Sequence, residues 1–229
     1  MVAHPSIRAR DAREGYHSPA LVAVAHGTRS AAGQAQIRAL VDAVAMCRPE
    51  LDVRLCHVDV QSPRVGDTMA AVGDAVIVPL LLSTGYHVRV DIAEAAGGCP
   101  VTPPLGPDPL LTEILAERAG HDHDALVLAA AGSSDPGWRA EIGEVAAELG
   151  AHVAYASGAD RRVPDVVADL RGRGAARITV AAYLLAEGLF YRSLHAAGAD
   201  RVTAPLCLDP RVAGLVARRY DHAAAVART

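Results

Sequence analysis

Two histidines, His26 and His87, could bind a metal ion or accept a proton, and each lies close after a predicted strand. Each follows an apolar run: residues 21–25 precede His26, and residues 75–82 precede the Ser-Thr-Gly turn that leads to His87. An unalternating run rich in Val, Ile and Leu is typical of a strand buried on both faces of a parallel sheet. Ligands of open α/β sheets bind beyond the carboxyl ends of the strands. The sequence therefore predicts both imidazoles at one such edge, where histidine serves as a metal ligand or a proton acceptor.

Helices must connect these strands, and several start and stop signals predict where they lie. Ser30 is placed to cap a helix whose apolar residues, 37 to 44, recur at helical spacing, and Pro49 ends it. Residues 51–60 are rich in β-forming residues. The Ser62-Pro63 pair predicts the start of a second helix. The remaining helices of this half are expected at about residues 88–95 and, after a proline-rich loop, at 110–119.

The second half of the chain repeats this pattern about 100 residues later. Residues 125–133 parallel the first strand and its loop, and residues 178–190 parallel the central stretch. Strands that alternate with helices predict an α/β fold of two tandem doubly wound parallel-sheet domains related by duplication. We expect a flexible tail at 1–19, a first domain at 20–120 and a second at 121–229. Ala131 and Phe190 replace the histidines, so one site is predicted, on the first domain.

Composition excludes several classes of protein. The 229 residues carry a net charge of −4, so no basic field is present to neutralise the phosphates of a nucleic acid. The four cysteines show no CxxC spacing, which argues against a zinc cage or a disulfide framework and favours a reducing compartment. No apolar run approaches the length of a membrane span, and the first 19 residues lack the core of a secretory signal. We expect a cytoplasmic protein with no membrane or nucleic-acid partner.

The motifs resemble those of the sirohydrochlorin chelatases, the small class II enzymes that insert a divalent metal ion into a tetrapyrrole. The resemblance rests on the His-Gly-Thr-Arg loop at 26–29 and on the block that runs from Pro79 through His87 to Ile92. A third match, at residues 59–63, places Asp59 where the family commonly has glutamate. The second half resembles the degenerate partner domain of two-domain members.

The resemblance implies a metal site formed by His26, Asp59 and His87. If the strands follow the order 2-1-3-4, these residues stand side by side, and two imidazoles with a carboxylate suit a first-row divalent ion. His26 and His87 are the expected catalytic pair, with at least one accepting a pyrrole proton. Fe²⁺, Co²⁺ and Ni²⁺ are all compatible with these ligands. The sequence contains no P-loop, which agrees with insertion that uses no nucleotide.

The substrate implied is sirohydrochlorin, a polycarboxylate. The candidate substrate-binding residues are Arg29, Ser83, Thr84, Gly85, Arg89 and Arg192. Arg64 is a further basic candidate. Phe190 and Tyr191 are either an apolar wall for the macrocycle or ordinary core residues. His57 is either a partner of the site or a buried histidine with satisfied hydrogen bonds, and the His/Asp cluster at 121–124 is interpreted as a solvated linker.

Two other functions remain open at this point. A non-catalytic carrier of metal or tetrapyrrole could have the same fold and the same histidines. A histidine phosphatase also has a histidine followed by glycine, but Ala25 stands where such an enzyme needs arginine to hold phosphate. Because the duplication could replace a dimer of one-domain chains, we expect a monomer.

Overall fold

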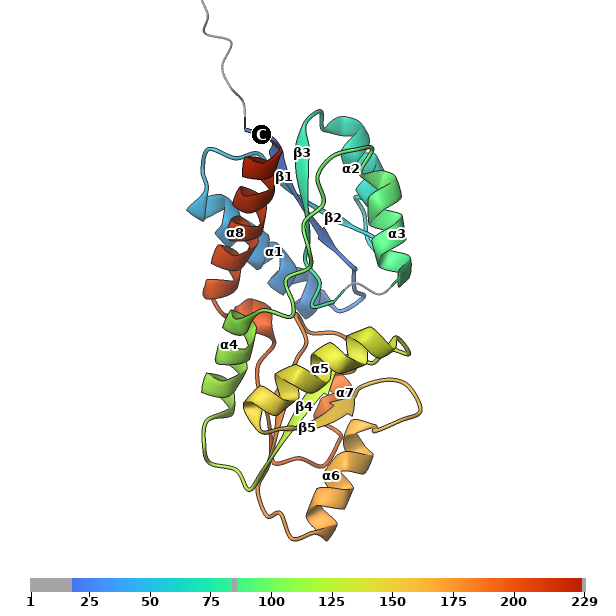
Figure 1. The fold of residues 1–229 in the computed structure, drawn as a ribbon, viewed down its shortest axis with the longest axis vertical. Helices are drawn as coiled ribbons and strands as arrows, with labels where there is room; N and C mark the ends of the chain where they lie inside the picture. Colours follow the sequence, from blue (N-terminus) through green and yellow to red (C-terminus); the bar gives the residue numbers. More distant parts are fainter. Residues whose placement is uncertain (1–17, 84–85, 228–229) are drawn as a thin grey trace, which may run out of the picture.

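The computed structural model describes residues 18–83 and 86–227, without the side chains of residues 86–89. It shows an α/β fold with two parallel sheets, one from each half of the sequence (Figure 1). The strands are β1 (Ala20–Ala25), β2 (Val53–His57), β3 (Ala75–Pro79), β4 (Ala125–Ala130), β5 (His152–Tyr155), β6 (Ile178–Ala182) and β7 (Arg201–Val202). The helices are α1 (Ala31–Cys47), α2 (Val65–Ala71), α3 (Tyr86–Ala95), α4 (Pro109–Ala119), α5 (Pro136–Leu149), α6 (Val163–Gly172), α7 (Leu189–Leu194) and α8 (Arg211–Val226), with a 3₁₀ turn at Leu206–Leu208. The predicted fold class is confirmed.

The two sheets have the same strand order. The first is β2-β1-β3 and the second is β5-β4-β6-β7, with every pair parallel. In the first half, Val101 makes an isolated parallel bridge to Ile77, at the place that β7 occupies beside β6 in the second half. The order 2-1-3-4 is thus confirmed. Because β1 lies between β2 and β3, the segments that follow these three strands meet at one edge of the sheet.

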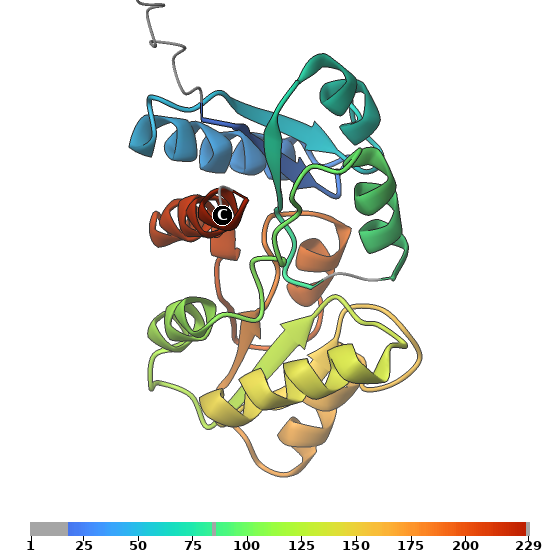
Figure 2. The ribbon, with the colours of Figure 1, turned by 45° about the horizontal axis from the view of Figure 1, so that its top comes forward.

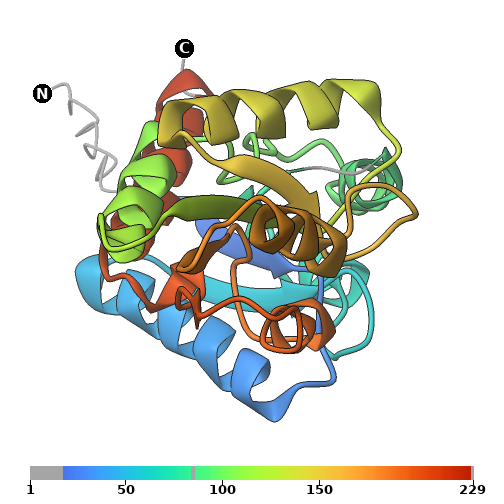
Figure 3. The same cartoon turned by 90° about the horizontal axis from the view of Figure 1, so that it is seen from below.

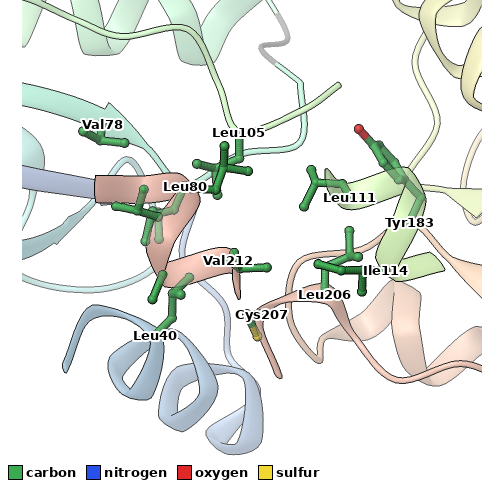
Figure 4. Packing of buried hydrophobic residues seen from close by; sticks show 14 of the residues in the cluster. Leu40, Val78, Leu80, Leu105, Leu111, Ile114, Tyr183, Leu206, Cys207 and Val212 are labelled. Atoms are coloured by element: carbon green, nitrogen blue, oxygen red, sulfur yellow. The ribbon is translucent and has the colours of Figure 1, made fainter. Parts of the chain in front are cut away.

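A single apolar core joins the two halves. Every residue of β1, β3, β4 and β6 is buried, which explains why their sequences do not alternate. The largest cluster of buried side chains includes Leu40 and Val78 from the first half and Ile114, Tyr183 and Leu206 around the second sheet (Figure 4). Smaller clusters cover the outer face of each sheet. The two halves are therefore joined by one continuous apolar cluster, whose burial stabilises both.

Each half contributes its last helix to the other half. Helix α4 packs on β6 and α5 of the second sheet, and α8 packs on α1 and β3 of the first. Figures 1 and 2 show α8 beside α1, and α4 against the second sheet. From below, α4 and α8 lie on the same side of the molecule (Figure 3). A sequence boundary near residue 120 therefore separates the strands of the two sheets. It does not separate the helices, because α4 and α8 each pack on the sheet of the other half.

Two arginines at equivalent positions of the repeat bind α8 and α4 to the opposite halves. Arg219 on α8 donates to the Asp108 carboxylate at 3.0 Å and to the carbonyls of Pro104 and Leu105. Arg118 on α4 donates to the carbonyls of Ala204 and Pro205 and lies 3.6 Å from the Asp209 carboxylate. Arg118 lies ten residues after Asp108, which Arg219 binds. Arg219 likewise lies ten residues after Asp209, which Arg118 contacts. The duplicated Asp-Pro segments thus form a reciprocal clamp between the halves.

The predicted helix starts are partly right. Ser30 caps α1 as predicted, accepting from the Gly33 amide at 3.3 Å. Helix α4, expected at 110–119, begins at Pro109, and its cap, Asp108, was not predicted. The predicted start at Ser62-Pro63 is wrong. The chain stays extended there, because the His57 amide donates to the Pro63 carbonyl and Arg64 forms a bridge with His57. Helix α2 therefore begins at Val65. Helix α3 begins at Tyr86, so the backbone of His87 belongs to its first turn and not to the expected loop.

Candidate active-site cleft

A cleft with a volume of about 410 Å³ lies between the two halves, at the carboxyl ends of both sheets. Most of its wall is apolar, with leucines from the ends of β3 and β6 and aromatic side chains from α5 and α7. Its polar lining residues are His26, Thr28, His57, Gln61, Ser83 and Glu187. A concave apolar site with a few polar groups is the usual form of a small-molecule site, and this volume suits a ligand of moderate size.

His26 lies on the lining of this cleft, and its loop is held by hydrogen bonds. Its carbonyl accepts from the Asp59 amide at 2.9 Å, and the Thr28 amide donates to the Gln61 side chain at 2.8 Å. Gly27 has φ +98°, and a Cβ at this position would lie 2.0 Å from the Asp59 carbonyl oxygen. Only glycine fits here without strain. The His26 imidazole is exposed, so a ligand in the cleft can reach it.

Asp59 is next to His26 but does not line the cleft. Its carboxylate accepts from the Val60 amide at 2.7 Å and forms an ion pair with Arg64 at 2.9 Å. The Val60 hydrogen bond, then Arg64, and more weakly the nearby His26, lower the pKa of this carboxyl below its usual value. The group is therefore ionised at neutral pH, with its charge directed at Arg64.

His57, at the end of β2, is buried and also lines the cleft. Burial lowers the pKa of its imidazole, since desolvation disfavours the charged form, and the charges of Arg38 and Arg64 act in the same direction. Its Nδ1 atom is buried without a hydrogen-bond partner among the described residues. The interpretation of His57 as a histidine with satisfied hydrogen bonds is therefore wrong for this nitrogen, and a neutral ring is favoured.

The other predicted site residues fall into three groups. Ser83 lines the cleft and accepts a hydrogen bond from Trp138 Nε1 at 2.6 Å. Thr84 and Gly85 lie outside the described residues, as do the side chains of His87 and Arg89, whose backbone belongs to α3. Arg29 and Arg192 are exposed and are not part of the lining.

Sequence reasoning missed several residues of the cleft. Trp138 and Glu187 come from the second half, from the start of α5 and from the loop before α7. Trp138, the only tryptophan of the chain, carries no periodic signal. The internal repeat could have identified Glu187, because this residue occupies the position that matches the site candidate Thr84. Phe190, predicted as wall or core, lines the cleft and is 38% exposed, which favours the wall.

The described part of the chain lacks a cluster of metal ligands and a helix that could span a membrane. Within residues 18–83 and 90–227, no three His, Cys, Asp or Glu side chains are grouped closely enough to hold a metal ion. The predicted triad includes the His87 side chain, which falls outside this search, so the triad stays a prediction. None of the described helices combines the length and the apolarity needed to cross a membrane.

The paired sheets and the cleft between them define an α/β protein with the chelatase fold. The sirohydrochlorin chelatase SirB of Bacillus subtilis subspecies spizizenii, solved in complex with cobalt, superposes with a TM-score of 0.71 at 20% identity, covering 90% of this chain and 95% of SirB. The structure described as CbiX, the terminal enzyme of sirohaem biosynthesis in denitrifying bacteria, gives 0.64 at 24% identity over 89% and 99% of the two chains.

The chain belongs to the CbiX family, because residues 20–122 and 125–223 each match the family's profile. The two matches follow the internal duplication. A curated relative, the sirohydrochlorin ferrochelatase of Priestia megaterium, is 29% identical over 157 residues, which make up 58% of this chain and 58% of that protein. This match thus spans little more than half the length of the relative.

Proposed function

We propose that the protein inserts a divalent metal ion, Fe²⁺ or Co²⁺, into sirohydrochlorin without using a nucleotide. The observation that carries this proposal is the apolar cleft between the halves, with the His26 imidazole on its lining. Membership of the CbiX family supports it. The relative from Priestia megaterium is a ferrochelatase, and SirB structures contain cobalt or Fe³⁺, so both metals are reasonable substrates.

The apolar lining of the cleft suits a flat macrocycle. Leucines 80 to 82 and Leu184 and Leu185 provide apolar contact for the ring, and Phe190 and Tyr191 provide aromatic surface. None of the described lining residues is Lys or Arg, so the carboxylate arms of the substrate would point out of the cleft. Arg29 and Arg192, which are exposed outside the lining, and Arg89, whose side chain lies outside the described residues, are our candidates to bind them. The lack of a lining arginine in this region also disfavours the phosphatase alternative.

In this proposal the metal enters from the first half of the chain. His26 and His87 hold the ion beside the macrocycle, and incomplete ligation allows its release to the four ring nitrogens. Asp59 assists from the adjacent strand end, where its negative charge favours a cation near His26. Both walls of the cleft come from one chain, so a monomer suffices. No step requires phosphate transfer, since the metallated product is the more stable species.

The test is anaerobic metallation of sirohydrochlorin by the full chain. Purified protein is mixed with sirohydrochlorin and Fe²⁺ or Co²⁺, and the visible spectrum of the macrocycle is followed against a protein-free blank. We expect faster metallation by the wild type and a loss of this acceleration in His26→Ala and His87→Ala. A folded protein that binds sirohydrochlorin but accelerates metallation with neither metal would be a carrier.

A further inference from the structure

The cleft contains a carboxylate that the proposed metal site does not use. Among the described residues, Glu187 is the sole acidic side chain of the lining, and it belongs to the second half. Asp59, the carboxylate expected from the family resemblance, faces Arg64 and lies outside the lining. Among the described residues, the acid group that faces the cleft is therefore the one from the second half.

Glu187 is held in place by a two-point contact with α1. Its Oε1 accepts from Gln36 Nε2 at 2.7 Å, and its backbone amide donates to Gln36 Oε1 at 2.8 Å. Its other carboxylate oxygen accepts no hydrogen bond from residues 18–83 and 90–227. One oxygen thus orients the group, and the second is available to a ligand.

The loop that carries Glu187 lies against the His26 loop. A Cβ at Gly33 would be 1.9 Å from the Glu187 carbonyl oxygen, so α1 and this loop touch through a position that only glycine allows. A Cβ at Gly188 would lie 3.6 Å from Thr28 Oγ1. Thr28 follows His26 by two residues, so the loops that carry the carboxylate and the imidazole adjoin each other, and both residues line the cleft.

We propose that Glu187 is a catalytic base that accepts the pyrrole protons of the macrocycle, an inference that rests on the function proposed above. When the metal ion binds the unprotonated ring nitrogens, the remaining N–H groups become more acidic. Each N–H bond then breaks, its electron pair stays on nitrogen and forms the bond to the metal, and the proton moves to the free Glu187 oxygen. Water takes the first proton from Glu187, and the second leaves by the same route. The metal approaches from the histidines and the protons leave toward the second half.

The decisive variant is Glu187→Gln, which keeps the size of the side chain and an oxygen that can accept from Gln36. We expect kcat for Co²⁺ insertion to fall by about 10²-fold or more, as for loss of a general base. Sirohydrochlorin affinity, measured by quenching of the single tryptophan, Trp138, should stay the same. The exposed Glu148 on α5 offers a matched control, and Glu148→Gln should have the wild-type rate.

A second pair of variants separates catalysis from the structural contact. In Glu187→Ala, added formate should restore part of the rate, because a small carboxylate can replace the missing base. Gln36→Leu breaks the contact but keeps the base, and should slow insertion less than Glu187→Gln. A wild-type rate in Glu187→Gln overturns the inference, as does weaker Co²⁺ binding by this variant without macrocycle, which would make Glu187 a metal ligand. If the wild type itself does not metallate sirohydrochlorin, the proposed function fails instead.

Discussion

The ends of β1 and β4 have the same backbone and different chemistry. The Asp59 amide donates to the His26 carbonyl at 2.9 Å, and the Ser157 amide donates to the Ala131 carbonyl at 3.0 Å. A glycine with positive φ follows in both loops, Gly27 at +98° and Gly132 at +106°. The loops thus keep their hydrogen bonds even though the side chain before the glycine is imidazole in one half and methyl in the other.

The side chains at the equivalent positions differ between the two halves. Ala131 and Ser157 replace His26 and Asp59, so these positions carry neither an imidazole nor a carboxylate. Tyr155 is buried at the position that matches His57 and packs against Trp138 at a centroid distance of 5.6 Å. We infer that duplication preserved the frame of the sheet, which stabilises the fold, while the second half came to provide wall and, in our proposal, a proton acceptor.

The largest contrast between the halves should appear when His26 is removed. His26→Ala should lower the rate of metal insertion by about 10²-fold or more, because the variant loses a ligand that holds the metal ion in position beside the macrocycle. The fold should persist, since the His26 side chain is exposed. Metallation kinetics and a thermal melt measure the two effects. A rate close to that of the wild type would remove His26 from the mechanism.

Replacing the glycine of either loop by alanine should lower the free energy of unfolding by a similar amount. Gly27→Ala and Gly132→Ala should each destabilise by about 1–3 kcal/mol from backbone conformation alone, with a further cost from the close carbonyl contact. Their Cβ atoms would lie 2.0 and 2.6 Å from carbonyl oxygens. Gly143→Ala in α5, where nothing lies within 4 Å, is the control and should stabilise by about 0.5–1 kcal/mol. Urea unfolding provides the comparison, and an unchanged Gly132→Ala would contradict the equivalence of the loops.

Removing either arginine of the reciprocal clamp should destabilise the protein. Arg219→Ala should cost about 1.5–3 kcal/mol, because it removes hydrogen bonds to Asp108 and two carbonyls. Arg118→Ala should cost somewhat less, since its carboxylate contact is longer, at 3.6 Å. Both values come from denaturant melts. If the halves unfolded in two separate transitions, the shared core would not couple them.

Acid should weaken the clamp at Asp209. Its hydrogen bonds to Arg211 are the main reason that the pKa of this carboxyl lies below its usual value, and Arg118 lowers the pKa further. A lowered native pKa means that the contribution to stability is complete above the unfolded pKa, about 3.9, and disappears as the pH falls through the native value. The difference in free energy of unfolding between wild type and Asp209→Asn should therefore shrink below about pH 4. A difference that is constant from pH 7 to pH 3 would contradict this.

Restoring the histidines should have the smallest effect. The double change Ala131→His and Phe190→His should create no second strong Co²⁺ site, because Ser157 stands where the first half has Asp59 and offers no carboxylate. Equilibrium dialysis of the variant beside the wild type counts the bound ions. One additional tightly bound ion per chain would show that the second half still has a competent site.

The sequence was most informative where the signal is local. Apolar runs predicted β1, β3, β4 and β6, because strands covered on both faces cannot tolerate polar residues. Ser30 predicted the start of α1 through its capping hydrogen bond. The helix start at Ser62-Pro63 failed for the opposite reason, since pairing of this segment with β2 outweighed the local capping signal.

The tertiary structure decided what depends on distant contacts. The repeat predicted two similar sheets but not the exchange of α4 and α8, which follows from burial of their apolar faces on the opposite halves. Asp59 and Arg64 were both candidates for the site, and only their position showed that they pair with each other.

His26, its loop and the order of the strands could therefore be read from the sequence, because each depends on neighbouring residues and on the general rules of parallel sheets. The contact between Gln36 and Glu187 could not, since it joins residues 151 positions apart. Their approach depends on how the two halves pack, which is governed by the sum of many buried contacts and not by a local motif.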